Sequence, residues 1–433
     1  MRVVGAAFCA AGLLVVPLAS AATFGRPAEI PLVRAPTAVV EVDATGDGIE
    51  DVVVANANGR PTLTVLPGKE DGSFGTPLVI GVGLAAQSLA VADFDNDGAD
   101  DLAVAGDGEI AMYYSAEGTL IQRAILSVPD VSSVRAVDLD LDGNLDVVAA
   151  SATRSSLTVF MGTGENTFLP GREYASGTDP AAVLIADLNG DELPDVVVGG
   201  NAMAVLFNNG DGTLSAPVSI PGAPSHVLAL AAEDLDGDGG VDLVVAHPNL
   251  ATVMINAGDG QFHDFRISGV GVTPTAIGIA FLDDDSNPDI VTANRGTNDV
   301  SILHGIGNGR FQAEERVKVG KGPVGLALED LNADGLNDLV TANRRARSVT
   351  ILLNGTDAPQ PVVCLVPRVA RRTLAVARRL VAAAHCKVAS VPRTYSRRVK
   401  KGKVISVTPA PGARRPVDTP VTLLVSRGRK PKR

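Results

Sequence analysis

The chain has 433 residues, of which 45% are hydrophobic and only 20% charged, so it can bury a large core, and this balance excludes a globally disordered protein. Its 46 glycines and 27 prolines predict many turns. The net charge of −12 conceals two opposite parts, because residues 358–433 hold 19 lysines or arginines and one acidic residue, which leaves 18 basic and 48 acidic residues in 1–357. This asymmetry indicates two domains with different partners.

Residues 1–21 have the pattern of a secretory signal peptide. Arg2 supplies the positive end, an apolar run extends from Val3 to Leu18, and Ala19-Ser20-Ala21 forms a small-residue cleavage site. The run is short for a membrane span and no other stretch is longer, so we expect no transmembrane helix. The mature protein is expected to begin at Ala22, to be secreted, and to be extracellular or associated with the cell wall.

One sequence pattern recurs seven times over residues 22–355. It consists of an apolar run, an acidic loop, an Asp that opens a second apolar run, and a Gly-rich turn. The acidic loops begin 45 to 50 residues apart, at Asp43, Asp93, Asp138, Asp187, Asp234, Phe281 and Asp330. This is the length of a four-stranded propeller blade, so the repeat predicts an all-β, seven-bladed β-propeller.

The two ends of the repeat region predict how the ring closes. The turn phrase that begins at Phe74 also appears at Phe24, before the first acidic loop, whereas the seventh repeat ends near Gly355 without a last strand of its own. We therefore expect residues near Phe24–Val33 to complete the seventh blade. Closure of this kind removes exposed sheet edges.

The acidic loops carry a ligand pattern for a hard cation. The pattern Asp-x-Asp/Asn-x-Asp-Gly-x-x-Asp appears as DFDNDGADD, DLDLDGNLD and DLDGDGGVD. Alternate residues of a tight loop can aim oxygens at one point, Gly at the sixth position permits the turn, and Ca²⁺ takes about six to eight oxygens. Metal-free acidic turns are the alternative, but seven loops in register favour Ca²⁺. Mg²⁺ fits less well because it demands octahedral geometry and retains water.

These loops resemble the FG-GAP or VCBS-type repeat family, which includes the head of integrin α-chains, over roughly residues 23–355. The candidate ligands are the first, third, fifth and ninth residues of each loop. Four loops are complete: Asp93/Asp95/Asp97/Asp101, Asp138/Asp140/Asp142/Asp146, Asp234/Asp236/Asp238/Asp242 and Asp330/Asn332/Asp334/Asp338.

The other three loops depart from the pattern. The first, Asp43/Thr45/Asp47/Asp51, has one carboxylate fewer and should bind more weakly. The fourth, Asp187/Asn189/Asp191/Asp195, keeps its ligands but has Glu192 in place of Gly, which puts its turn in question. In the sixth, Phe281 and Ser286 replace the first Asp and the Gly, leaving Asp283, Asp285 and Asp289. It is the weakest candidate, and we expect Phe281 to serve as a core residue.

A basic domain follows a linker at residues 356–361. Residues 362–427 include VPRVARRTLAVARRLVAAAHCKVASV and VISVTPAPGARRPVDTPVTLLVS and resemble a PASTA domain, which implies a small α+β fold that binds peptidoglycan or related muropeptides. Thr373 can cap a helix that ends near Ala384, and a last strand is expected at Val421–Ser426. The apolar stripe of this helix comprises Leu374, Ala377, Leu380, Val381 and Ala384.

Two cysteines remain once Cys9 leaves with the signal. Cys364 and Cys386 are expected to form a disulfide in an exported protein, whereas free thiols or a metal site with His385 fit less well. The positive charge adds attraction to anionic wall polymers, polysaccharides or membrane surfaces, although residues 428–433 are equally explained as a solubilising tail. Tyr395 is the only aromatic residue of this domain, which argues against nucleic acid.

The propeller sequence carries no recognisable catalytic motif. Its four histidines, His226, His247, His263 and His304, fall at different phases of the repeat and favour scattered positions over a catalytic cluster. We expect a non-enzymatic, monomeric interaction or adhesion module, stabilised by calcium, whose propeller face binds an unknown protein or glycan. The alternatives are an extracellular carbohydrate-active lyase or hydrolase, or a lectin.

Overall fold

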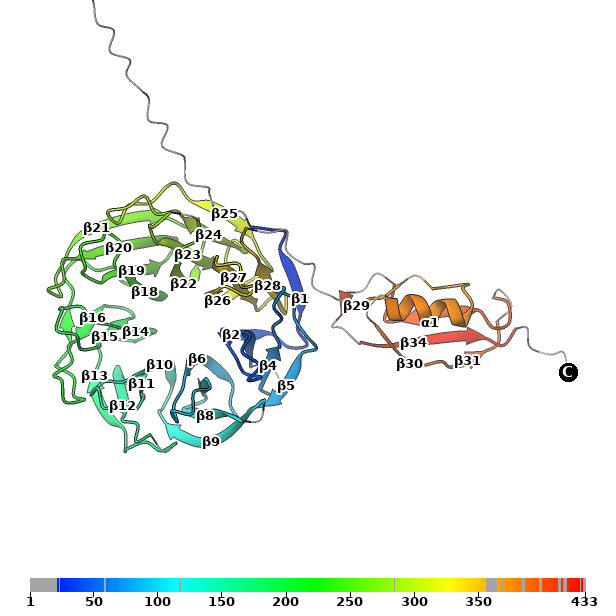
Figure 1. Ribbon diagram of the computed structural model, residues 1–433, viewed down its shortest axis with the longest axis horizontal. Helices are drawn as coiled ribbons and strands as arrows, with labels where there is room; N and C mark the ends of the chain where they lie inside the picture. Colours follow the sequence, from blue (N-terminus) through cyan, green and yellow to red (C-terminus); the bar gives the residue numbers. More distant parts are fainter. Residues whose placement is uncertain are drawn as a thin grey trace, which may run out of the picture.

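The computed structural model describes most of the chain after the expected signal peptide. The described residues are 22, 24–57, 60–116, 118–164, 166–283, 285–355, 364–367, 369–383, 386–396, 399–411, 414–415, 419–428 and 430. The expected signal peptide at 1–21 and the expected linker at 356–361 lie outside them. Within the described part, residues 24–355 form seven four-stranded antiparallel sheets around one axis (Figure 1), which confirms the seven-bladed β-propeller.

Each blade contributes one strand to each of four layers. The innermost strands are β2 (Pro36–Val42), β6 (Ala86–Ala92), β10 (Val131–Val137), β14 (Ala182–Ala186), β18 (Ala229–Glu233), β22 (Pro274–Ala280) and β26 (Pro323–Glu329). The second strands are β3 (Asp51–Asn56), β7 (Asp101–Gly106), β11 (Asp146–Ser151), β15 (Asp195–Gly199), β19 (Asp242–His247), β23 (Asp289–Asn294) and β27 (Asp338–Asn343). The third strands are β4 (Thr62–Leu66), β8 (Glu109–Ala116), β12 (Ser156–Phe160), β16 (Ala204–Leu206), β20 (Leu250–Asn256), β24 (Asp299–Leu303) and β28 (Ser348–Leu352). The outer strands are β5 (Leu78–Gly81), β9 (Thr119–Ser127), β13 (Arg172–Ala175), β17 (Val218–Ser219), β21 (Phe262–Gly269), β25 (Glu315–Lys318) and β1 (Ala28–Pro31).

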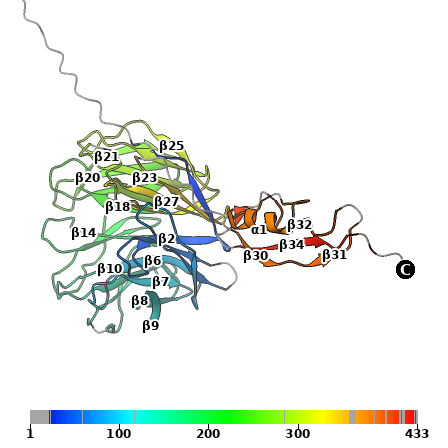
Figure 2. The same ribbon diagram turned by 45° about the vertical axis from the view of Figure 1, so that its right-hand side comes forward.

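Burial follows the layers and explains the sequence of each strand. The second strands are apolar runs, such as DVVVAN in β3, and are buried at nearly every residue because neighbouring blades cover both faces. The outer strands, such as REYA in β13, are mostly exposed and accept polar residues. Figure 2 shows the inner strands β2, β6, β10 and β14 in the middle of the ring.

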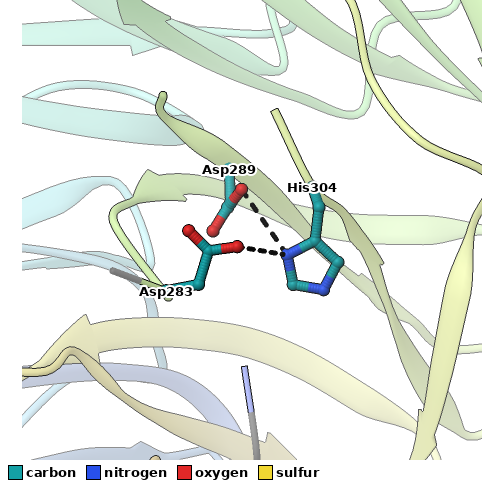
Figure 3. Close-up of side chains that lie close together, drawn as sticks. All are labelled: Asp283, Asp289 and His304. Carbon is teal, nitrogen blue, oxygen red and sulfur yellow. Dashed lines mark ion pairs between the residues drawn. The ribbon is translucent and has the colours of Figure 1, made fainter. Parts of the chain in front are cut away.

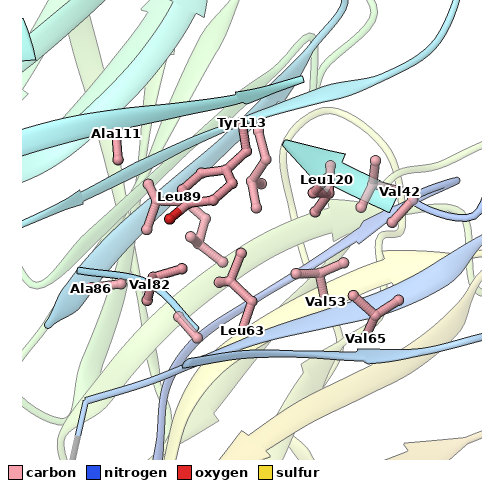
Figure 4. Close-up of a cluster of buried hydrophobic side chains, with 14 of the residues drawn as sticks. Val42, Val53, Leu63, Val65, Val82, Ala86, Leu89, Ala111, Tyr113 and Leu120 are labelled. Atoms are coloured by element: carbon pink, nitrogen blue, oxygen red, sulfur yellow. The ribbon is translucent and has the colours of Figure 1, made fainter. Parts of the chain in front are cut away.

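The hydrophobic cores lie between blades. Figure 4 shows one of them, in which Val53, Leu63 and Val65 of the first blade pack against Leu89 and Tyr113 of the second. Comparable clusters join each following pair of blades and the seventh blade to the first. A single blade therefore cannot bury its apolar faces alone, and the ring is the cooperative unit.

The first strand of the propeller closes the ring, as expected from the sequence. Strand β1 pairs with β28 in antiparallel register, with Ala28 opposite Ile351 and Pro31 opposite Ser348. Phe24 forms a further bridge to Asn354. The seventh blade thus contains both ends of the repeat region, and the edge of β28 is covered.

The C-terminal part forms a small α+β unit. Its helix α1 (Leu374–Ala383) agrees with the predicted helix, and its strands are β29 (Cys364–Leu365), β30 (Lys387–Ser390), β31 (Arg393–Thr394), β32 (Val404–Thr408), β33 (Arg414–Arg415) and β34 (Pro420–Ser426). Strand β34 pairs with β30, β31 and β32. Ala377 and Val381 of the predicted helical stripe are buried against this sheet, with Leu374 partly buried beside them. The side chain of Leu380 and residue Ala384 lie outside the described part.

Candidate metal centres

The acidic loops connect each inner strand to the second strand of the same blade. In the six loops that begin with Asp, one oxygen of this residue accepts the amide of the sixth loop residue at 2.7–3.0 Å. Its other oxygen accepts the amide of the fourth or fifth residue. The first Asp therefore folds the loop around its own carboxylate.

The sixth loop residue needs the left-handed backbone conformation. Gly98 has φ = 87° and Gly143 has φ = 88°, which glycine adopts without steric strain. Glu192 takes the same conformation in the fourth loop, with φ = 66°, and still donates its amide to Asp187 at 2.8 Å. The fourth loop thus keeps the turn, although the backbone of Glu192 is in a conformation that is unfavourable for a residue other than glycine.

The ninth residue of every loop is a buried Asp held by two backbone amides. These seven residues are 0–1% exposed: Asp51, Asp101, Asp146, Asp195, Asp242, Asp289 and Asp338. One oxygen accepts an amide near the start of its own loop at 2.8–3.1 Å. The other accepts an amide just after the third strand or at its end, at 2.7–2.9 Å. The ninth Asp thus ties the loop to two strands, whether or not a cation is bound.

In three loops the first, third and ninth carboxylates converge. Their oxygens lie within 4.8 Å of one another in Asp93/Asp95/Asp101, Asp138/Asp140/Asp146 and Asp234/Asp236/Asp242. Three carboxylates at this separation repel one another unless a proton or a cation lies between them.

The fifth residue of each loop, also a candidate ligand, has a different environment from the first, third and ninth residues. Asp97, Asp142 and Asp238 are exposed and lie outside the three converging groups of the described residues. Asp47 of the first loop is exposed as well, and its loop forms no such group within the described part. In these four loops one oxygen of each fifth residue accepts the amide of the seventh residue at 2.8–3.0 Å. The third residues Asp140 and Asp236 accept the same kind of hydrogen bond and still belong to converging groups, so this bond does not exclude a ligand role.

The buried carboxylates and the oxygen atoms of these loops fit a hard cation. Burial raises the pKa of Asp101 to about 7 and that of Asp146 to about 6, because the charged form has lost its hydration. Asp95 Oδ1 is buried and has no hydrogen-bond partner among the described residues. The donors are all oxygens, which is the ligand type that Ca²⁺ prefers.

In the remaining loops that begin with Asp, the third position holds a neutral residue in place of a carboxylate. In the fourth and seventh loops, Asn189 and Asn332 donate their side-chain amides to the fifth residues, Asp191 and Asp334, at 3.0 Å. In the first loop, Thr45 occupies the third position and its amide is bonded to Asp51 at 2.9 Å. Calcium binding by any of the loops stays a prediction.

The sixth loop differs from the expectation in one further respect. Phe281 is 49% exposed, so the expectation that it serves as a core residue is wrong. It occupies the first loop position, beyond the end of β22, and the adjacent Leu282 takes the fully buried place.

The same loop lies beside a histidine that the sequence interpretation did not connect with it. Figure 3 shows the ring of His304 facing Asp283 and Asp289. His304 Nδ1 is 3.7 Å from Asp283 Oδ2 and 3.6 Å from Asp289 Oδ1. The sequence did contain a signal for this neighbour. His304 lies two strands after Asp283, at a repeat position where other blades have residues such as Tyr114, Phe207 and Leu353.

A polar cavity opens along the axis of the ring. It has a volume of about 260 Å³ and is lined by residues from the beginning to the middle of the inner strands, including Thr37, Gln87, Ser132, Arg135 and Thr275. The acidic loops follow the ends of the same strands. Arg135 donates Nη1 to the carbonyl of Val134 at 2.7 Å, and burial lowers its pKa.

The structure also bears on the expected disulfide and on membrane insertion. Cys386 is buried and disulfide-bonded, whereas the side chain of Cys364 lies outside the described part, so their pairing stays a prediction. Among the described helices, none has the length and apolar character needed to span a bilayer.

Comparisons with known proteins add the family and the fold. The FG-GAP-like repeat family matches residues 43–104, 93–149, 138–198, 187–245 and 282–341, and the PASTA domain family matches residues 365–427. No curated protein matches the sequence. The solved structure of BBS1N in complex with ARL6DN is similar with a TM-score of 0.56 and 13% identity, covering 79% of this chain and 98% of that chain.

A second similar structure is a lectin from Agrocybe aegerita that recognises non-reducing terminal N-acetylglucosamine. It has a TM-score of 0.51 and 18% identity, covering 76% of this chain and 87% of that chain. At these identities the two structures show a common fold and nothing about ligands.

Proposed function

Because this chain belongs to the FG-GAP-like repeat family and carries a C-terminal PASTA domain, we propose that it is a secreted, calcium-stabilised interaction module retained at the cell wall. Propellers and PASTA domains of these families are typically non-enzymatic. The combination fits a protein that presents one rigid surface to a partner while a second domain provides attachment.

The observation that carries the calcium proposal is the convergence of three carboxylates in each of the second, third and fifth loops. The proposed ligands there are the first, third and ninth residues, with Asp95 Oδ1 as the buried oxygen that lacks a partner among the described residues. The side chains of the fifth residues, such as Asp238, would rotate toward the ion and become additional ligands. Calcium would supply positive charge that offsets the repulsion and the lost hydration of these groups. Since the loops join the inner and second strands, binding would stabilise the folded ring by mass action.

The proposed attachment rests on the C-terminal domain. PASTA domains suggest peptidoglycan-related ligands, and the excess of basic residues in 358–433 adds an attraction to anionic wall polymers. Export by residues 1–21, a domain division at 22–355 and 362–427, and a Cys364–Cys386 disulfide belong to the same proposal.

Cosedimentation with purified peptidoglycan tests the attachment directly. The full mature chain should pellet with the polymer, and neutralising the exposed Arg393, Lys400 and Lys401 to glutamine should reduce the pelleted fraction. Neutralising three exposed propeller residues, Arg344, Arg345 and Arg347, is the matched control and should leave it unchanged. If both sets of substitutions reduce the pelleted fraction equally, nonspecific charge explains the binding. If the unaltered chain does not pellet with the polymer, wall retention is refuted.

The proposed partner site on the propeller is the axial cavity between the inner strands. Its hydroxyl and amide groups and the single charge of Arg135 among the named lining residues are suited to a polar ligand, either a glycan or a protein loop. A glycan array probed with the mature protein distinguishes the lectin alternative from a protein partner. Binding lost on R135Q would favour a glycan at this cavity.

A further inference from the structure

The sixth acidic loop lacks the oxygen pattern of the other loops and has a histidine nitrogen beside it. Phe281 replaces the first Asp. Both oxygens of the fifth residue, Asp285, accept hydrogen bonds from Asn287, at 2.7 Å from its backbone amide and at 3.0 Å from its side-chain amide. Of the usual carboxylates, only Asp283 and Asp289 therefore aim an oxygen at the same point as His304.

His304 is held in this place by the register of the blade. It follows β24, and the next residue, Gly305, donates its amide to Asp289 at 2.8 Å. The imidazole is 5% exposed and its Nδ1 has no hydrogen-bond partner among the described residues, since both neighbouring carboxylates lie beyond hydrogen-bond length. A buried nitrogen is thus aimed at two carboxylate oxygens, at 3.6 and 3.7 Å.

The other ring nitrogen has a partner that fixes the ring. His304 Nε2 lies 3.4 Å from Glu315 Oε2, on the adjacent strand β25. A histidine that binds a metal commonly donates its second N–H to a carboxylate, which orients the ring and leaves a lone pair on the first nitrogen. With Nε2 protonated, the lone pair of Nδ1 would face two negative oxygens, an arrangement that needs either a second ring proton or a metal cation.

We propose that Asp283, Asp289 and His304 bind a divalent first-row transition metal of the Zn²⁺ class, with Glu315 as the positioning residue for the histidine. An imidazole and two carboxylates select such an ion over calcium, which prefers oxygen ligands alone. Zinc lies about 2.0–2.2 Å from nitrogen and oxygen ligands, which separates neighbouring ligand atoms of a tetrahedral site by about 3.4 Å. The separations of 3.6 and 3.7 Å fit this geometry.

The test is equilibrium dialysis of the full mature chain against Zn²⁺, and separately Co²⁺, in millimolar Ca²⁺ that saturates the oxygen-only loops. Metal content is then measured by mass spectrometry. The expected result is about one transition-metal ion per chain that calcium does not displace, with visible Co²⁺ absorption bands of a low-coordinate nitrogen and oxygen site.

The key variant is H304L, because leucine occupies the equivalent buried position in the seventh blade as Leu353. It should lose the transition-metal ion and the Co²⁺ bands while keeping the calcium stoichiometry. E315Q should retain the site but weaken its affinity by about 10- to 100-fold, as expected for a positioning carboxylate. H263N, which changes an exposed histidine of the fifth blade, is the control and should bind like the unaltered chain.

The proposal is overturned if H304L and the unaltered chain bind equal amounts of Zn²⁺. It is also overturned if millimolar Ca²⁺ displaces the ion, or if no transition metal binds and His304 is simply protonated between the carboxylates. If H304L fails to fold, the Zn²⁺ affinities of E315Q and D283N test the proposal instead. Weaker binding in both supports the site, and unchanged affinity in both refutes it.

Discussion

The Asp at the ninth position of each loop combines two roles that the sequence pattern does not separate. As a proposed ligand it shares its function with the first and third residues. As an acceptor of two backbone amides it also holds the loop against the second and third strands, as Asp101 does with the amides of Phe94 and Ser115 at 3.0 and 2.8 Å. The third residue has no comparable link between strands, so the two positions respond differently to substitution.

We predict that D101N destabilises the protein with or without calcium, whereas D95N affects only calcium binding. D101N removes an acceptor from a buried amide, and an unsatisfied buried group costs about 1–3 kcal/mol. Asp95 has its pKa raised by burial and by Asp97, so neutralising it should not lower the stability of the calcium-free protein. Urea unfolding in chelator and in calcium measures both effects. Equal stabilities of the two variants in chelator would contradict the structural role of Asp101.

The buried carboxyls also predict an unusual pH dependence of the calcium-free protein. The folded-state pKa is about 7 for Asp101 and Asp338 and about 6 for Asp146 and Asp242, above the ordinary 3.8. Between these values the folded state retains protons that the unfolded chain has released, so the free energy of unfolding in chelator should fall as pH rises from about 4 to about 7. Calcium should reverse this trend, because it binds deprotonated carboxylates. Thermal melts across this range check the sign, and a flat profile in chelator would contradict it.

At the scale of the loop, backbone conformation matters as much as ligand type. We predict that E192G stabilises the fourth loop by about 1 kcal/mol, because glycine removes the strain of a side chain at φ = 66°. The converse change, G98A, should destabilise the second loop by a similar amount, since φ is 87° there although a Cβ would meet nothing within 4 Å. Denaturant unfolding of both variants measures the pair. Changes of the same sign would contradict the backbone explanation.

The closing strand is the element on which the whole ring depends. Deleting residues 22–31 removes β1, and with it Ala28 and Ile30 from the core between the seventh and first blades. We predict loss of cooperative unfolding and a tendency to aggregate through the uncovered edge of β28. I30A, which keeps the strand, should instead lower stability by about 2–4 kcal/mol and leave the protein monomeric. Size-exclusion chromatography with thermal melting distinguishes these outcomes, and a monomeric, cooperative deletion variant would refute the closure role.

Much of the fold could be predicted because the repeat is periodic in sequence. The spacing of the acidic loops determined the number of blades, and the phrase at Phe24 located the closing strand. Phe281 was placed wrongly because hydrophobicity alone does not show that its position lies beyond the strand end. His304 was missed because its distance from Asp283 depends on the register between two strands of a blade. The axial cavity was missed for a related reason, since it forms only where seven inner strands meet.

The spacing of the candidate ligands did not predict which carboxylates of each loop converge. It grouped the fifth residues, such as Asp47 and Asp238, with the other ligands, because alternate positions of a loop can share one side. In the structure these two carboxylates accept the amides of Ile49 and Gly240 at 3.0 and 2.8 Å and are exposed. Which carboxylates of a loop converge thus depends on the side-chain conformations of the folded loop, and spacing alone does not contain that information.

At the scale of the whole molecule, the chain has an acidic propeller and a basic C-terminal part, to which the proposed function assigns different roles. The acidic propeller would concentrate calcium and be stabilised by it outside the cell, while the basic C-terminal domain would bind anionic wall material. High salt should therefore weaken wall retention more than it weakens the folded propeller, because exposed charges are screened whereas buried carboxylate sites are screened much less.

Calcium titration of the purified mature protein, by calorimetry together with thermal melting in chelator and in millimolar Ca²⁺, tests the central claim most directly. We predict binding of about five to six calcium ions through the oxygen-only loops and a large rise in melting temperature. Absence of both binding and stabilisation would contradict the account, and the acidic loops would then be turns that the ninth Asp stabilises without a metal.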